Sequence, residues 1–270
     1  MNELQACELE ILKQVIQVFD KLNIQYFMIG GSALGAVKYQ GFIPWDDDID
    51  IGLYREDYNK FLGEAHSYLP SHLFLQNHHT DRKYAQVYSK VRNCNTTYIE
   101  KSVAHLDINH GVYIDVFPLD GYPRNVEEQA KLENKKRLYK FVCESNYRYK
   151  RSAKEKLVVR ALRLLAVSKW TGSVLKKYER LIASYDVQDS DTICNHGNWK
   201  GKLEYVPKEY YGEGTWTTFE DIQVRVPEKY DAYLTQKYGN WRVELPEEEQ
   251  RGHHYHEVCD VNQPYSNYTK

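Results

Sequence analysis

Four carboxylates crowd into five positions near the start of the chain, at Asp46, Asp47, Asp48 and Asp50. Like charges this close raise one another's pKa and oppose ionisation unless a cation or solvent compensates them. The alternation Asp-Ile-Asp-Ile is typical of a β-strand, whose successive side chains point to opposite faces. Asp48 and Asp50 therefore share one face, and the pattern predicts that these two carboxylates bind one metal ion.

A glycine pair precedes this acidic run. Residues 24–29 are mostly apolar and predict a buried strand, after which Gly30 and Gly31 let a ligand approach the backbone closely. Ser32 is predicted to cap a short helix over residues 33–38. The free N–H groups of that helix would form an anion site beside the metal.

A second informative stretch is residues 111–120, GVYIDVFPLD, which alternate as a strand around one ionisable residue, Asp115. A charged residue is rarely buried without a partner. Asp115 is therefore either a functional carboxylate with a partner or a carboxylate at a sheet edge or in a turn.

Two basic residues, Lys90 and Arg92, lie two positions apart on one face of the strand predicted around residues 84–91. Positive groups there would neutralise a pyrophosphate as its bond breaks. Alternatively, both are surface charges on an exposed strand.

Residues 30–52, GGSALGAVKYQGFIPWDDDIDIG, and residues 114–121, IDVFPLDG, resemble the LicD family of choline-phosphate transferases. That family has the nucleotidyltransferase fold of the DNA polymerase β superfamily, and fukutin and fukutin-related protein, which use CDP-ribitol, are distant relatives. The resemblance runs from about residue 25 to about residue 256 and is weakest in the basic helices. It implies transfer of phosphocholine from CDP-choline to a sugar hydroxyl of a teichoic acid or lipopolysaccharide precursor, with release of CMP.

The resemblance also implies roles for single residues. Asp48, Asp50 and Asp115 would be the catalytic residues and would bind Mg²⁺, or alternatively Mn²⁺, since carboxylate oxygens suit hard cations. Asp115 would accept the proton of the attacking hydroxyl. The residues expected to contact substrate are Gly30, Gly31, Ser32, Trp45, Asp47, Lys90, Arg92 and His253.

Some assignments stay open. Asp46 and Asp47 would orient metal-bound water, contact choline or shape the turn. Choline recognition needs aromatic faces, but with 24 Tyr and 5 Trp in the chain no cage can be assigned. We reject zinc binding by the residues His253, His254, His256 and Cys259, because no complementary ligand spacing exists elsewhere. His78 and His79 are assigned to a loop.

Three alternatives to the phosphocholine hypothesis remain. The donor would be another CDP-alcohol, carrying ribitol or glycerol; the reaction would be nucleotidyl transfer from a nucleoside triphosphate, with pyrophosphate release; or the chain would be a non-catalytic scaffold at a membrane. No nucleic-acid partner is expected.

Charge is distributed unevenly along the chain, although its net value is only -2. Residues 131–180 hold 16 Lys or Arg against 4 Asp or Glu. Two or three helices are predicted over residues 126–149 and 153–185. Their junction, with Arg148, Lys150, Arg151, Lys154 and Lys156, is either a solvated face or a surface for anionic lipid or a polyanionic acceptor.

The five cysteines are widely spaced and odd in number, which indicates reduced thiols. Residues 1–10 are polar and acidic, so we expect no signal peptide, and no segment is apolar enough to span a membrane. A cytoplasmic location is expected, peripheral on the inner face of the cell membrane if the basic helices contact lipid.

The predicted fold is α/β (α+β), with a nucleotidyltransferase-like mixed sheet flanked by helices. We divide it into a catalytic core (1–125), a basic helical region (126–190) and a C-terminal α/β element (191–270) that completes the active-site cleft. Periodicity predicts the following further elements: helices over 3–22 and 55–69, strands over 73–76 and 96–99, and a strand over 219–226 followed by a helix that ends at Gly239.

Overall fold

A mixed β-sheet forms the centre of the protein. The computed structural model describes residues 1–147, 167–198, 200–252 and 254–268. Within them, five strands of the sheet follow the order β1-β2-β6-β4-β3. Strand β7 pairs with the last two residues of β6, and β8 pairs with β7. Only β2 and β6 are parallel in this path, so the predicted mixed sheet is confirmed. These strands are β1 (Tyr26–Met28), β2 (Asp50–Tyr54), β3 (Leu73–Gln76), β4 (Ser89–Asn93), β6 (Val112–Gly121), β7 (Thr192–Cys194) and β8 (Tyr205–Pro207).

Two helices from the N-terminal part of the chain pack against the sheet. Helix α1 (Glu3–Leu22) has the predicted bounds and begins at a capping box in which the Asn2 side chain accepts the Gln5 N–H. Helix α3 (Arg55–Glu64) is shorter than predicted and continues as a 3₁₀ turn, η1 (Ala65–Ser67). Phe19 of α1 meets Phe61 of α3 edge to face, with ring centroids 5.2 Å apart, so both helices share the main apolar core.

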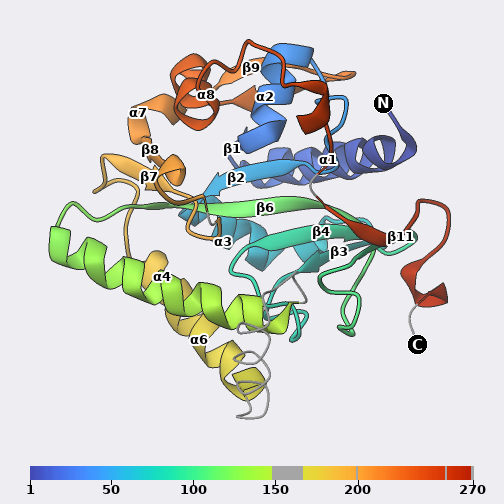
Figure 1. Cartoon of the computed structure of the whole chain (residues 1–270), viewed down its shortest axis with the longest axis horizontal. Coiled ribbons are helices and arrows are strands. Elements are labelled where there is room, and N and C mark those ends of the chain that lie inside the picture. The colour runs from blue at the N-terminus through green and yellow to red at the C-terminus, as the bar shows by residue number, and fades with distance from the viewer. Residues whose placement is uncertain (148–166, 199, 253, 269–270) are drawn as a thin grey trace.

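A second layer of helix and hairpin covers the β1 end of the sheet (Figure 1). It contains α2 (Gly30–Tyr39), the hairpin β9 (Thr215–Phe219) and β10 (Ile222–Val226), and α8 (Tyr230–Tyr238). Gly239 ends α8 as predicted. Strand β9 was missed because its Thr-Trp-Thr-Thr sequence carries no apolar alternation.

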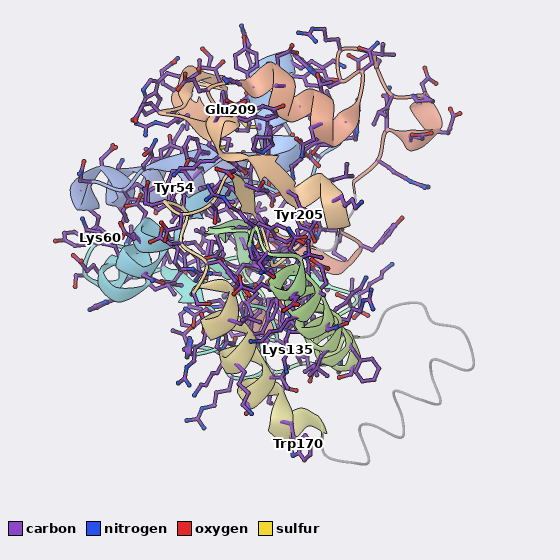
Figure 2. The ribbon with its side chains drawn as sticks, turned by 90° about the vertical axis from the view of Figure 1, so that its left-hand side faces the viewer. Tyr54, Lys60, Lys135, Trp170, Tyr205 and Glu209 are labelled. Atoms are coloured by element: carbon purple, nitrogen blue, oxygen red, sulfur yellow. The ribbon has the colours of Figure 1, made fainter. Side chains whose placement is uncertain are left out.

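Helices α4 (Val126–Asn146) and α6 (Val167–Ile182) lie beyond the β4 side of the sheet (Figure 1). Tyr139 of α4 and Tyr178 of α6 stack with ring centroids 4.4 Å apart inside a second apolar core. Trp170 projects from the far tip of α6 (Figure 2). The predicted basic junction between the helices lies outside the described residues. Every helix that the structure describes is too short or too polar to cross a lipid bilayer.

The C-terminal segment returns to the sheet region. Strand β11 (His256–Asp260) pairs with β5 (Thr97–Glu100). The remaining short elements are η2 (Gly201–Glu204), α7 (Lys208–Tyr211), η3 (Glu247–Glu249) and η4 (Tyr265–Asn267). Strand β7 pairs with the core strand β6 and β10 lies beside β1, so residues after 191 attach to the same sheet. The division into three domains stays a prediction.

One predicted strand is misplaced. The strand expected over residues 84–91 begins at Ser89 instead, because the preceding residues enter the second core as irregular chain: Ala85 and Val87 are buried there. The shift keeps Lys90 and Arg92 on one strand, but neither is a surface charge, since both are buried.

Candidate active site

Three carboxylates meet at the centre of the sheet. Asp50 is the first residue of β2 and lies opposite Asp115 in the parallel register with β6, and Asp48 precedes β2 by two residues. One oxygen from each of Asp48, Asp50 and Asp115 lies within 4.8 Å of the others. The backbone holds this arrangement, since the Asp115 N–H donates to the Ile49 carbonyl at 2.8 Å. The three residues predicted from the acidic run and the second strand are thus neighbours in space.

The carboxylates repel one another. Burial and the charges of Asp48 and Asp115 hold the pKa of Asp50 well above its usual value. The pKa of Asp46 rises to about 8, mainly through burial and then through the charges of Asp48 and Asp47. Acidic oxygens that are close, partly buried and mutually destabilised fit a hard divalent cation such as Mg²⁺.

Lys90 is the basic residue closest to the carboxylates. It lies opposite Asp115 in the antiparallel register of β4 and β6, and its Nζ is 2.8 Å from Asp115 Oδ1. Arg92 lies two residues further along β4. It donates to Gln76 Oε1 at 2.5 Å and to the Gly111 carbonyl at 2.7 Å, so much of its donor capacity holds the fold together.

The glycine pair lies directly against the acidic side chains. Gly30 has a left-handed φ of +58°, and a Cβ there would lie 3.1 Å from Asp50 Oδ2; a Cβ on Gly31 would lie 2.9 Å from Asp46 Oδ2. The Gly30 N–H donates to the Tyr233 hydroxyl at 3.0 Å. The left-handed backbone favours glycine at position 30, and a side chain at either position would displace a neighbouring carboxylate.

The predicted cap at Ser32 is wrong. Helix α2 begins at Gly30, with Ile29 in the N-cap position, and Ser32 lies inside its first turn. The Ser32 hydroxyl accepts the Asp50 N–H at 2.8 Å instead. A cap motif shows only that a hydroxyl is available, and here a backbone donor from a distant strand takes it.

Trp45 and Asp47 flank the cluster. Trp45 is half-buried and packs edge to face on Tyr39, with ring centroids 6.3 Å apart. Asp47 accepts the backbone N–H of His254 at 3.0 Å, so it ties the acidic run to the C-terminal segment. This contact spans 207 residues of the chain and was not among the three roles predicted for Asp47.

His254 reaches the carboxylates from the far end of the chain. Its Nε2 lies 3.1 Å from Asp48 Oδ2, and its Nδ1 lies 3.2 Å from Glu100 Oε1. Burial alone would lower the pKa of His254, but the hydrogen bonds to Asp48 and Glu100 outweigh it and raise that pKa well above the usual value. The substrate-binding residue predicted from the sequence was its neighbour His253, which lies outside the described residues.

Two further acidic residues were missed. Glu100, at the end of β5, is the second partner of His254, and Glu8 of α1 is buried with a pKa raised by burial and by the charges of Asp48 and Asp47. The sequence could have indicated that Glu8 is buried, because it lies four positions from Leu4 and Leu12 on the apolar face of α1. No local sequence pattern indicated Glu100, because its position depends on the pairing of β5 with β11.

A cavity of about 770 Å³ opens beside Lys90 and His254. Its size suits a small organic ligand. Arg92 and Glu100 contribute charged groups to the wall, and four tyrosines contribute aromatic surface: Tyr84, Tyr88, Tyr147 and Tyr255. The Tyr84 hydroxyl is buried without a hydrogen-bond partner among the described residues. The aromatic faces suit an organic cation, and the side chains of Lys90, Arg92 and Lys101 in the same wall suit phosphate groups.

Part of the chain matches a known protein family. Residues 23–142 match the family described as LicD/FKTN/FKRP, nucleotidyltransferase domain. The chain carries a LicD-family domain. All three carboxylates, the glycine pair and Lys90 lie within the matched residues of this LicD-family domain, whereas His254 lies outside them.

Similarity to one relative extends over nearly the whole chain. The lipopolysaccharide cholinephosphotransferase LicD of Haemophilus influenzae is 27% identical over 267 residues, which cover 96% of this chain and 97% of that protein. Human ribitol 5-phosphate transferase FKRP is 42% identical over 48 residues, or 18% of this chain and 10% of FKRP. An uncharacterized protein of Rickettsia prowazekii is 32% identical over 119 residues, 43% of this chain and 40% of that protein.

Proposed function

We propose that the protein transfers phosphocholine from CDP-choline to a sugar hydroxyl of a lipopolysaccharide or teichoic acid precursor. The observation that carries the proposal is the meeting of Asp48, Asp50 and Asp115 inside a LicD-family domain, in a chain similar over its length to a lipopolysaccharide cholinephosphotransferase. We also propose that the reaction takes place on the cytoplasmic side, with the acceptor at the membrane face.

Asp48, Asp50 and Asp115 would hold Mg²⁺, with Mn²⁺ as the alternative. When bound, the cation would neutralise phosphate oxygens of the donor and so favour a loose, charge-spread transition state. The cluster fits this role because its oxygens lie within 4.8 Å of one another and because burial and mutual repulsion raise the pKa of Asp50.

The protein's own groups would carry the rest of the reaction. The acceptor hydroxyl oxygen bonds to the phosphorus that carries choline, and the bond from that phosphorus to the bridging oxygen breaks, so that CMP leaves. Asp115 would take the hydroxyl proton. Lys90, 2.8 Å from Asp115, would face the negative charge that develops on the leaving phosphate. His254 would hold Asp48 in position through their 3.1 Å contact.

The cavity tyrosines support choline as the transferred alcohol. A trimethylammonium group offers no N–H donor, so it is bound by aromatic faces, whereas ribitol needs hydrogen-bonding partners. CDP-ribitol remains the second candidate, because 48 residues are 42% identical to the ribitol 5-phosphate transferase FKRP.

Product analysis tests the proposal. Purified protein, MgCl₂ and a choline-free lipopolysaccharide or teichoic acid precursor are incubated with CDP-choline, CDP-ribitol, CDP-glycerol or CTP, and CMP and pyrophosphate are measured separately. We expect CMP release and acceptor labelling with CDP-choline, and loss of both in Asp50→Asn. Preference for CDP-ribitol or CDP-glycerol would correct the donor, and pyrophosphate release from CTP would replace the proposal with nucleotidyl transfer.

A further inference from the structure

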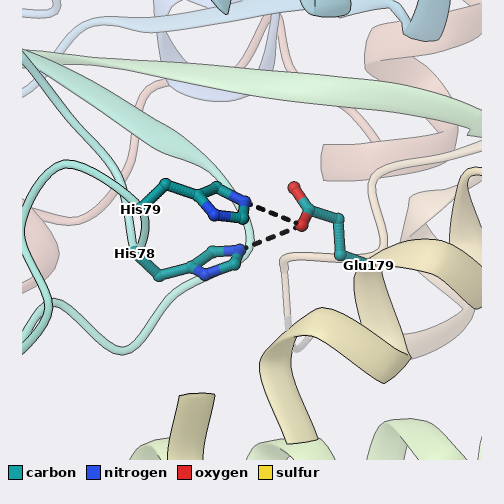
Figure 3. A group of neighbouring side chains, drawn as sticks. All are labelled: His78, His79 and Glu179. Atoms are coloured by element: carbon teal, nitrogen blue, oxygen red, sulfur yellow. Dashed lines mark hydrogen bonds and ion pairs between the residues drawn. The ribbon is translucent and has the colours of Figure 1, made fainter. Parts of the chain in front are cut away.

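A group of side chains of the kinds that ligate metals shares no residue with the cluster of Asp48, Asp50 and Asp115. His78 and His79 follow β3, Glu179 lies on α6, and the three side chains converge (Figure 3). His78 Nε2 lies 3.0 Å and His79 Nε2 lies 3.2 Å from Glu179 Oε2. We infer that these residues form a site for a divalent cation of the zinc class, which fastens α6 to the loop after β3.

The donor atoms select the kind of cation. Two imidazoles and a carboxylate are a common zinc-binding set, whereas Mg²⁺ and Ca²⁺ prefer oxygen ligands alone. In tetrahedral coordination with zinc–nitrogen distances of about 2.0–2.1 Å, neighbouring ligand atoms lie about 3.3 Å apart. The separations of 3.0 and 3.2 Å are close to this value, so small side-chain shifts would admit the ion. Water would complete the fourth position.

The turn that carries both histidines is held by hydrogen bonds of its own. Asn77 Oδ1 accepts the N–H groups of His79 and Thr80 at 2.9 and 3.1 Å, and Thr80 Oγ1 donates to the Leu75 carbonyl at 2.8 Å. The rings of His78 and His79 lie 3.9 Å apart between centroids. The turn therefore points two nitrogens at Glu179 before binding, which lowers the entropy that coordination would cost.

The site is open on one side. Side-chain exposure falls from 48% at His79 through 19% at Glu179 to 3% at His78. An ion would enter past His79 and come to rest against His78.

A series of contacts connects α6 to the cavity beside Lys90. Tyr178, next to Glu179, stacks on Tyr139, whose hydroxyl donates to Gln86 Oε1 at 3.0 Å and accepts the Val87 N–H at 3.0 Å. Gln86 lines that cavity. An ion that fixes α6 would therefore also fix one wall of the cavity. The inference about the ion itself does not depend on the proposed reaction.

Cobalt and zinc binding to the full chain tests the site. The background is Asp48→Asn/Asp50→Asn, which removes the carboxylate cluster and the neighbouring group of Asp47, Asp48 and His254. After chelator dialysis, Co²⁺ and Zn²⁺ are titrated. We expect one equivalent of Co²⁺ with the visible bands of tetrahedral nitrogen–oxygen coordination, its displacement by Zn²⁺, and a rise in Tm with Zn²⁺.

Three further variants locate the ion. In the same background, Glu179→Gln and His79→Asn should weaken binding at least about tenfold and remove the rise in Tm, while His66→Asn, an exposed histidine elsewhere, should change neither. His79 is half-exposed, so its variant tests binding even if Glu179→Gln fails to fold. Binding that is absent from the background protein, or unchanged in both ligand variants, would overturn the inference and leave an ion pair alone.

Discussion

Lys90 Nζ lies 2.8 Å from Asp115 Oδ1, and both side chains are only 5% exposed. The ammonium also lies 3.3 Å from the centre of the Tyr113 ring. Burial raises the pKa of Asp115, and the charge and hydrogen bond of Lys90 offset part of that rise. Lys90 thus supplies fixed positive charge to a carboxylate cluster that would otherwise be strongly self-repelling.

Replacing Lys90 by Met should lower the transfer rate by about 100-fold, because one preorganised charge facing the leaving phosphate is lost. CMP release under saturating CDP-choline measures the effect. Lys83→Met is the matched control: its ion pair with Asp107 is exposed, at 55% and 91%, and its loss should leave the rate unchanged. A Lys90→Met protein with the wild-type rate would remove Lys90 from the mechanism.

His254→Asn should raise the Mg²⁺ concentration that gives half-maximal activity by about 10- to 100-fold, the usual cost of losing an outer partner of a metal ligand. The reason is that Asp48 loses its 3.1 Å contact with Nε2. Activity as a function of MgCl₂ measures the shift. His256→Asn, an exposed position two residues on, is the control. An unchanged Mg²⁺ dependence in His254→Asn would contradict the positioning role.

Tyr255→Ala tests the aromatic wall with little risk to the fold, because this tyrosine is exposed yet lines the cavity. Loss of one cation–π contact, about 0.5–2 kcal/mol, corresponds to about 2- to 30-fold weaker CDP-choline binding. Calorimetry should show that change for CDP-choline and none for CTP. Tyr68→Ala, at an exposed tyrosine away from the cavity, serves as control. Equal losses for both nucleotides would argue against choline at this wall.

His196 should make stability depend on pH. Burial lowers its pKa to about 4, while the unfolded chain keeps a value near 6.5. Between these pKa values the unfolded state binds more protons than the folded state. The free energy of unfolding should therefore have its highest contribution from His196 above pH 6.5, and this contribution should fall as the pH drops towards 4, by up to about 3 kcal/mol. Denaturant unfolding at pH 7.5 and 5 measures it. His196→Gln should show a smaller difference between the two pH values than His66→Asn does; equal differences would contradict the assignment.

Two glycine-to-alanine changes should have opposite signs. Gly30→Ala combines a left-handed φ with a Cβ 3.1 Å from Asp50 Oδ2, so it should cost at least about 1 kcal/mol of stability and reduce Mg²⁺ binding. Gly63→Ala lies in α3 with no atom within 4 Å of the new Cβ, and should stabilise by about 0.5–1 kcal/mol. Thermal unfolding compares them. A neutral Gly30→Ala would show that the backbone at this turn relaxes freely.

Sequence patterns predicted the features that are local. The period of α1, the limits of β3 and the shared face of Asp48 and Asp50 follow from residues close in the chain. The spatial meeting with Asp115 was predicted from the family resemblance, and the strand pattern alone left its role open. Contacts between distant segments could not be read in this way. His254 meets Asp48 across 206 residues, and only the pairing of β11 with β5 brings them together.

Arg92 is a second case in which contacts between distant segments could not be predicted. Its position on one face with Lys90 was predicted, and so was a role beside phosphate, but its partners Gln76 and Gly111 come from β3 and from the turn before β6. Strand alternation gives the face on which a side chain lies. It does not show whether groups on neighbouring strands will accept the hydrogen bonds of that side chain.

The central position of β6 has a consequence for biosynthesis. β6 lies between β2 and β4, and Asp115 meets Asp50 on one side and Lys90 on the other. A nascent chain that has emerged only as far as residue 111 holds the acidic run and Lys90 but lacks the strand that joins them. The ability to bind a divalent cation should therefore appear only after residues 112–121 have been made and β6 has docked between β2 and β4.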